Sequence, residues 1–145
     1  MKTINFTEHQ IKDIAENLEC GLICYYNIKT NQFKYLIEDY DPLVTGIDES
    51  EFGLDDIEEN PDDYLEFELM SSHQSFNVMA DFAESVSDEE LQKRLFQALN
   101  RPKPFRNFKW IIDNSGEYRQ HWFDFKHLRY KKWVIEQLDD HNFNR

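Results

Sequence analysis

The residues best suited to bind a ligand lie between Arg101 and Trp110, where cationic side chains alternate with aromatic rings. The four cations are Arg101, Lys103, Arg106 and Lys109. Pro104 suits the first position of a helix, because a proline lacks only an N–H that would be unsatisfied there. A helix N-terminus beside cations favours an anion. The segment therefore predicts a surface for a carboxylate, a phosphate or a nucleic-acid backbone.

A structural explanation of the same segment competes with this one. Phe105 and Phe108 lie three residues apart and Ile112 follows four later, so all three fall on one side of a short helix. They would then fill a core, while the cations pair with acidic residues elsewhere in the chain. Both explanations stay open at this stage.

A second set of polar residues has the spacing of a catalytic or metal site. Glu117, His121 and Asp124 lie within about 60° of one another on an ideal helix, given about 100° per residue. This arrangement suits a general base with an orienting acid, or half of a metal site. It equally describes a solvated face opposite Tyr118 and Trp122. His121 joins the four cations as a ligand-binding candidate.

Neither this set nor a known motif is enough to assign a catalytic residue, a cofactor or a metal ligand. The sequence has no Gly-rich phosphate loop and no Gly-x-Ser-x-Gly elbow. The acidic run Asp55 to Asp63 offers carboxylates suited to calcium or magnesium, yet it lacks the EF-hand spacing. A solvated acidic loop, a weak divalent site or a patch for a basic partner would each explain this run.

Charge is divided unevenly along the chain. Between Lys34 and Lys93 there are 19 Asp and Glu and no Lys or Arg, whereas residues 91–145 have twelve bases and six acids. The net charge is −13, which disfavours non-specific binding to nucleic acid or anionic membranes. The acidic connection Asp39–Asp63 and the segment Arg101–Lys109 are therefore the two predicted contact surfaces.

The first half of the chain predicts one helix and a small antiparallel sheet. Thr7 and Gln10 form a capping box ahead of an apolar stripe, and Gly21 suits the helix end. Strands are expected over 22–26 and 33–37, joined by a turn in which Asn31 tolerates a left-handed backbone. Residues 64–69 alternate apolar and polar side chains, which predicts a third strand.

The second half predicts about four helices. Ser87 and Glu90 suggest a capping box for a helix that continues through Leu99. The last segment, 117–140, is helical in composition, but its apolar side rotates, which predicts a bend near His127 to Tyr130 or two helices. The order of strands followed by helices indicates an α+β fold, and 145 residues predict a single domain over 1–145.

Five motifs lie along most of the chain: Gly21…Cys24-Tyr25-Tyr26-Asn27…Thr30-Asn31, Phe76-x-x-Met79-x-x-Phe82, Leu95-Phe96-x-Ala98-Leu99, Pro104-Phe105-Arg106-x-Phe108-Lys109 and His121-Trp122-Phe123-x-Phe125. With these motifs the chain resembles a bacterial uncharacterised protein family (UPF, number zero-one-five-eight). Such sequences usually have Thr-Gly where this chain has Thr30-Asn31. The resemblance implies one domain of this type. It brings no established activity, cofactor or catalytic residue.

The N-terminus has no signal-peptide core and no apolar run is long enough to span a bilayer, so a cytoplasmic location without membrane contact is expected. Cys20 and Cys24 lack redox or zinc spacing and are expected to be reduced, buried thiols. The leading hypothesis is a non-enzymatic binding or regulatory module for a protein partner. Nucleic-acid or phosphate binding, and an enzyme on such substrates, are the alternatives; oligomeric state stays open.

Overall fold

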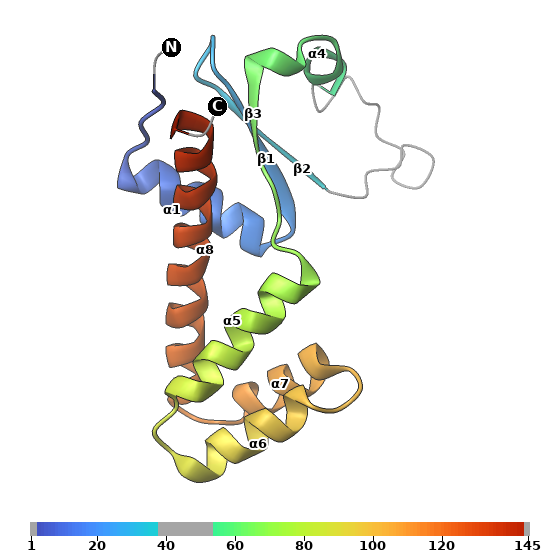
Figure 1. Cartoon of the computed structure of the whole chain (residues 1–145), viewed down its shortest axis with the longest axis vertical. Helices are drawn as coiled ribbons and strands as arrows, with labels where there is room; N and C mark the ends of the chain where they lie inside the picture. The colour runs from blue at the N-terminus through green and yellow to red at the C-terminus, as the bar shows by residue number, and fades with distance from the viewer. Residues whose placement is uncertain (1–2, 38–53, 144–145) are drawn as a thin grey trace. The chain divides into compact units, whose positions relative to one another are not determined.

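The structure is a computed structural model that describes residues 3–37 and 54–143. In chain order its elements are α1 (Glu8–Glu19), β1 (Leu22–Asn27), β2 (Phe33–Ile37), α4 (Leu54–Glu59), the 3-10 turn η1 (Pro61–Asp63), β3 (Tyr64–Phe67), α5 (Ser72–Ser85), α6 (Glu89–Leu99), α7 (Pro104–Asp113) and α8 (Tyr118–Phe143) (Figure 1). The predicted α+β class is confirmed, with an N-terminal helix, a small antiparallel sheet and a helical C-terminal region.

The chain divides into two compact units, each with a core of its own. Unit 1 comprises Met1–Leu69 and Tyr130–Arg145, and unit 2 comprises Met70–Arg129. The buried residues of the sheet, α1 and the end of α8 form one apolar cluster, and those of α5, α6, α7 and the start of α8 form another. The expectation of a single domain over 1–145 stays a prediction.

Helix α1 begins as its sequence predicts. Thr7 Oγ1 accepts a hydrogen bond from the Gln10 N–H at 3.1 Å, and Gln10 Oε1 accepts one from the Thr7 N–H at 2.9 Å. This reciprocal box satisfies two donors that a helix start would leave open. After α1, Gly21 has φ +85°, which a glycine adopts without the penalty of a Cβ.

The sheet has the order β2-β1-β3, and both pairings are antiparallel. Asn27 shapes the turn between β1 and β2, because its Oδ1 accepts from the N–H groups of Lys29 and Thr30 at 2.9 and 3.0 Å. Asn31 has φ 63°, the left-handed conformation expected of it. Alternation in β3 is also confirmed, since Leu65 and Phe67 are buried while Glu66 is exposed.

Only one of the two cysteines is buried as expected. Cys24 is buried in the core of unit 1, and burial raises the pKa of its thiol to about 12, although a hydrogen bond with Tyr35 acts in the opposite direction. Cys20 is instead exposed, because it caps the C-terminus of α1 and its side chain leaves the apolar face of that helix. Both are free thiols.

Unit 2 is a group of helices around an aromatic centre. The Phe108 ring lies 4.9 Å from Trp122 and 6.5 Å from Phe82, centroid to centroid, in edge-to-face contacts. Helix α6 begins at a different cap from the one predicted: Asp88, not Ser87, accepts from a backbone N–H, that of Leu91 at 3.1 Å. A capping aspartate serves as well as a serine, and the Ser87 hydroxyl lies 3.0 Å from the Tyr118 hydroxyl instead.

Helix α8 is one helix of 26 residues, which corrects the expectation of two helices. Its apolar side rotates because its two parts serve different cores. Trp122 belongs to the core of unit 2, whereas Val134 and Leu138 belong to that of unit 1. Charged side chains recur along its length, and none of the described helices combines the length and the apolarity that crossing a bilayer would require.

Candidate functional site

Helices α6 and α7 enclose a hollow of about 250 Å³ within unit 2. We call it the α6–α7 hollow. It is lined by Arg94, Gln97, Ala98, Arg101, Asn107, Trp110 and Ile111. Arg94 and Arg101 are seven residues apart, which brings them to nearly the same side of α6 and its end, with Gln97 between them. The lining includes two guanidinium groups and no carboxylate.

The turn into α7 shapes one wall of the hollow. Lys103 has φ 59°, a left-handed conformation that reverses the chain before Pro104 begins the helix. The Asn107 side-chain amide donates to the Pro102 carbonyl at 2.9 Å and holds this turn in place. This bond uses one of the two N–H donors of the amide, so the other N–H and the amide oxygen of Asn107 remain able to bond a ligand.

Two aromatic side chains of α7 face water. Trp110 is 63% exposed although it lines the hollow, and Phe105 is 44% exposed. The exposure of Phe105 corrects the expectation that it joins Phe108 and Ile112, which are both 1% exposed, in the core. Phe105 is the second residue of α7, where a side chain of the first turn lies beside the entering loop. Trp110 thus presents an indole on the same hollow that Arg94 and Arg101 line.

Of the predicted ligand-binding residues, only Arg101 lines the α6–α7 hollow. Lys103 and Arg106 are exposed, and Arg106 is one turn before Trp110 on the same side of α7. Lys109 points elsewhere: its Nζ lies 3.3 Å from Asp113 Oδ2, and its side chain is 80% exposed. His121 lies on α8 with its ring 5.3 Å from that of Tyr118, and it does not line the hollow.

Two polar residues of the hollow, Arg94 and Gln97, lie outside the segment singled out from the sequence, whereas Trp110 is its last residue. The spacing of Arg94 and Arg101 was available in the sequence, because seven residues are close to two helical turns. That this spacing forms a site depends on the packing of α7 against α6, which places Trp110 in the same hollow as the two arginines.

The set Glu117, His121 and Asp124 is not assembled as a site. Asp124 Oδ1 accepts from the Gln120 side-chain amide at 2.9 Å, and His121 meets Tyr118. Glu117 precedes α8 and its backbone carbonyl accepts from the Gln120 and His121 N–H groups. In the part of the chain that the structure describes, no hydrogen bond or ion pair joins these three side chains to one another.

Ion pairs with the acidic stretch do form, but at other cations. The Arg129 guanidinium lies 2.8 Å from Asp81 within unit 2, and Lys29 Nζ lies 3.3 Å from Asp63 within unit 1. Among the described residues, neither Arg94 nor Arg101 takes part in an ion pair. Arg94 also lines a second hollow, of about 360 Å³, together with Asp88, Glu90 and Glu117, whereas of these two hollows Arg101 lines only the α6–α7 hollow.

The acidic connection Asp39–Asp63 lies partly outside the described residues, which resume at Leu54. In its described part, Asp56 accepts hydrogen bonds from the Tyr64 hydroxyl and the Asn60 amide. The Tyr64 hydrogen bond is the main cause that lowers the pKa of Asp56. Over residues 3–37 and 54–143, no three His, Cys, Asp or Glu side chains are grouped as a metal site would require.

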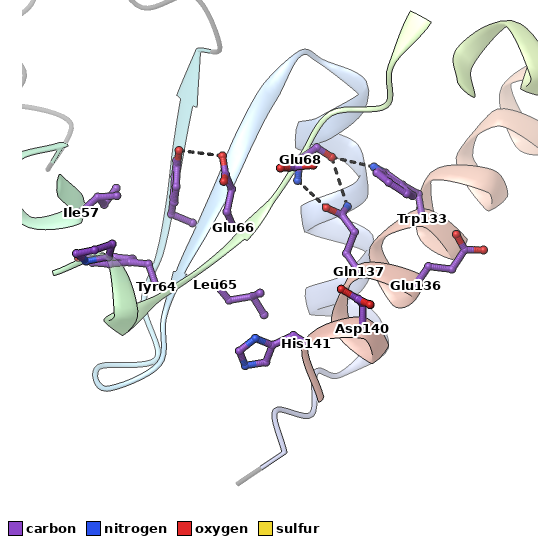
Figure 2. Close-up of a pocket in the computed structure, with 12 residues that line it drawn as sticks. Ile57, Tyr64, Leu65, Glu66, Glu68, Trp133, Glu136, Gln137, Asp140 and His141 are labelled. Carbon is purple, nitrogen blue, oxygen red and sulfur yellow. Dashed lines mark hydrogen bonds between the residues drawn. The ribbon is translucent and has the colours of Figure 1, made fainter. Parts of the chain in front are cut away.

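A larger cavity, of about 650 Å³, lies within unit 1 beside the free edge of β3 (Figure 2). We call it the β3 cleft. Four of its lining residues are acidic, namely Glu66, Glu68, Glu136 and Asp140, and none is Lys or Arg. Among Asp, Glu, Lys and Arg, the β3 cleft is thus lined only by acids and the α6–α7 hollow only by bases.

A family model for an uncharacterised protein family, UPF0158, matches residues 21–145. The chain belongs to this family. The match includes both cavities and begins after the end of α1. Membership confirms the resemblance found in the sequence.

One curated relative in this family is "UPF0158 protein PA5073" of Pseudomonas aeruginosa, which is 29% identical over 86 residues. The similar region covers 59% of this chain and 56% of the relative, so it spans little more than half of the relative's length. No solved structure matches the chain.

Proposed function

We propose that this UPF0158 member is a non-enzymatic binding module that holds a short acidic segment of a partner protein in the α6–α7 hollow. The observation that carries the proposal is the lining itself: Arg94 and Arg101 converge beside the exposed ring of Trp110, without a carboxylate. The position of Arg106 on the same side of α7 as Trp110 adds positive charge near the entrance.

The chemistry of the lining suits a carboxylate on a peptide. A guanidinium donates two parallel N–H bonds to one carboxylate, and this fork is the strongest ordinary pairing for that group. Gln97 and the amide oxygen of Asn107 supply hydrogen bonds to a peptide backbone. The indole of Trp110 offers apolar area with one N–H donor, a combination enriched at the centre of protein interfaces.

Size and charge favour a peptide over other anions. The hollow of about 250 Å³ is smaller than the roughly 300–1,000 Å³ usual for small-molecule sites. It accommodates one or two side chains of a larger partner. A long polyanion would meet the whole protein, whose net charge is −13, and long-range repulsion opposes such binding. Nucleic acid is therefore the less favoured ligand.

Charge reversal at the hollow tests this proposal. We expect Arg101→Glu to weaken binding of a fluorescein-labelled, Glu-rich decapeptide by at least about tenfold, because one of two converging guanidinium groups becomes a carboxylate. Fluorescence anisotropy at low salt gives the affinity. Lys93→Glu is the matched control: it makes the same change of net charge beside Arg94, at an exposed residue that does not line the hollow. Its effect should stay below about threefold.

Two results would contradict the proposal. Equal losses in Arg101→Glu and Lys93→Glu would mean that overall charge, and not the hollow, governs binding. A single-stranded oligonucleotide that binds more tightly than the acidic peptide, with an affinity that falls steeply with salt, would assign the surface to nucleic acid instead.

A further inference from the structure

The free edge of β3 has backbone groups that no neighbouring strand uses. The Ile28 N–H donates to the Asp63 carbonyl at 2.8 Å, and the Asn27 N–H donates to the Gln32 carbonyl on the other side. Because antiparallel pairs alternate, the N–H and C=O of Glu66, which is opposite Tyr25, point away from β1. In the described sheet, β1 is the only strand that pairs with β3.

Side chains of helix α8 already bond the next outward-facing backbone groups along this edge, those of Glu68. The Glu68 N–H donates to Gln137 Oε1 at 2.7 Å, and the Glu68 carbonyl accepts from Trp133 Nε1 at 2.8 Å (Figure 2). Side chains of the helix thus stand in for a further strand at Glu68. They do not extend to Glu66, whose backbone groups have no hydrogen bond among the described residues. The edge at Glu66 opens into the β3 cleft.

Four acidic residues, and no Lys or Arg, line the cleft at this edge. Glu66 and Glu68 come from the strand and its end, while Glu136 and Asp140 lie one turn apart on α8. The Tyr25 hydroxyl donates to Glu66 Oε1 at 3.1 Å, and Lys132 Nζ lies 4.0 Å from Glu136 Oε1, at the limit of an ion pair. These contacts leave most of the carboxylate oxygens of Glu66 and Glu136 available to other cations.

We propose that the β3 cleft binds a short extended segment of a basic partner protein, which adds to β3 as a further strand and directs Lys or Arg side chains at these carboxylates. Strand addition gives affinity through main-chain hydrogen bonds and specificity through alternate side chains. The Glu66 N–H and C=O supply one hydrogen-bonded pair, and the Tyr64 carbonyl supplies a further acceptor, since the Tyr64 N–H donates to Pro61.

Charge excludes a second copy of this chain as the occupant. Pairing β3 with β3 of another copy would bring Glu66 and Glu68 of both copies together, and like charges opposite one another destabilise a sheet. A basic strand instead places cations beside Glu66, Glu68 and Glu136. This site is separate from the α6–α7 hollow and takes a partner of the opposite charge.

A peptide of alternating Lys and Val, eight residues long and fluorescein-labelled, tests the site on the full chain. We expect Glu136→Lys to weaken its binding by at least about tenfold, measured by anisotropy at low salt. Asp139→Lys is the matched control, because this exposed neighbour on α8 does not line the cleft and its reversal should cost less than about threefold. Arg101→Glu, which disables the α6–α7 hollow, should not weaken binding of this basic peptide.

A second peptide separates strand addition from charge alone. The same sequence with alternate backbone nitrogens methylated keeps every ammonium group but loses the N–H donors of one edge. We expect at least about a tenfold loss of affinity for the version that blocks the edge facing β3. Equal binding of both peptides, or equal losses in Glu136→Lys and Asp139→Lys, would overturn the proposal.

Discussion

Replacing Phe108 by alanine should lower the free energy of unfolding by about 3–5 kcal/mol. The ring is 1% exposed and lies in edge-to-face contact with Phe82 and Trp122 at the centre of unit 2. Its removal loses both the transfer of a large ring from water and the contacts that line the resulting cavity. Urea unfolding followed by circular dichroism gives the change.

Phe105→Ala is the matched control for this prediction. It makes the same chemical change three residues earlier in α7, at a ring that is 44% exposed, and should cost less than about 1 kcal/mol. A loss below about 1 kcal/mol for Phe108→Ala would mean that α7 packs on a different face from the one described.

Replacing Phe67 by alanine should have an effect of similar size in unit 1, again about 3–5 kcal/mol. This side chain is fully buried, is opposite Cys24 in the sheet, and its ring centroid lies 5.9 Å from that of Phe6. β3 pairs with one strand only in the described sheet, so packing of Phe67 and Leu65 does much to hold it. We expect faster amide hydrogen exchange in β1 and β3 as well as a lower urea midpoint.

Phe143→Ala provides the control for Phe67→Ala within the same unit. Its ring is 70% exposed near the end of α8, and its loss should change the free energy of unfolding by less than about 0.5 kcal/mol. Unchanged exchange in β1 and β3 after Phe67→Ala would contradict the assignment of this ring to the core of unit 1.

Local chemistry made much of the fold predictable. The box of Thr7 and Gln10, the left-handed Asn31 and the proline that begins α7 each act within a few residues, so the sequence alone contains their cause. Predictions were wrong where the burial of a side chain depends on residues that are distant in the sequence. Phe105 fits the apolar spacing of α7, yet its ring is 44% exposed because no core residues pack against that side of the first turn.

The candidate sites depend on packing to a greater extent. Arg101 was predictable from the basic segment, but its partner Arg94 comes from the preceding helix and meets Trp110 only because α6 packs on α7. Similarly, Glu66 and Glu68 are visible as polar positions of a strand, whereas Glu136 and Asp140 come from the last helix, about seventy residues later. Counting charges along the chain indicates the sign of the net charge of a segment. It does not indicate which side chains come together in one cavity.

We infer that the basic α6–α7 hollow binds an acidic partner and that the acidic β3 cleft binds a basic one. Chemical-shift mapping of the ¹⁵N-labelled chain with each of the two peptides tests it most directly. The Glu-rich peptide should shift amides of α6 and α7 around Arg94, Arg101 and Trp110. The Lys–Val peptide should instead shift those of β3 and the last turns of α8. Shifts of the same amides by both peptides, or shifts spread evenly over the chain, would contradict it.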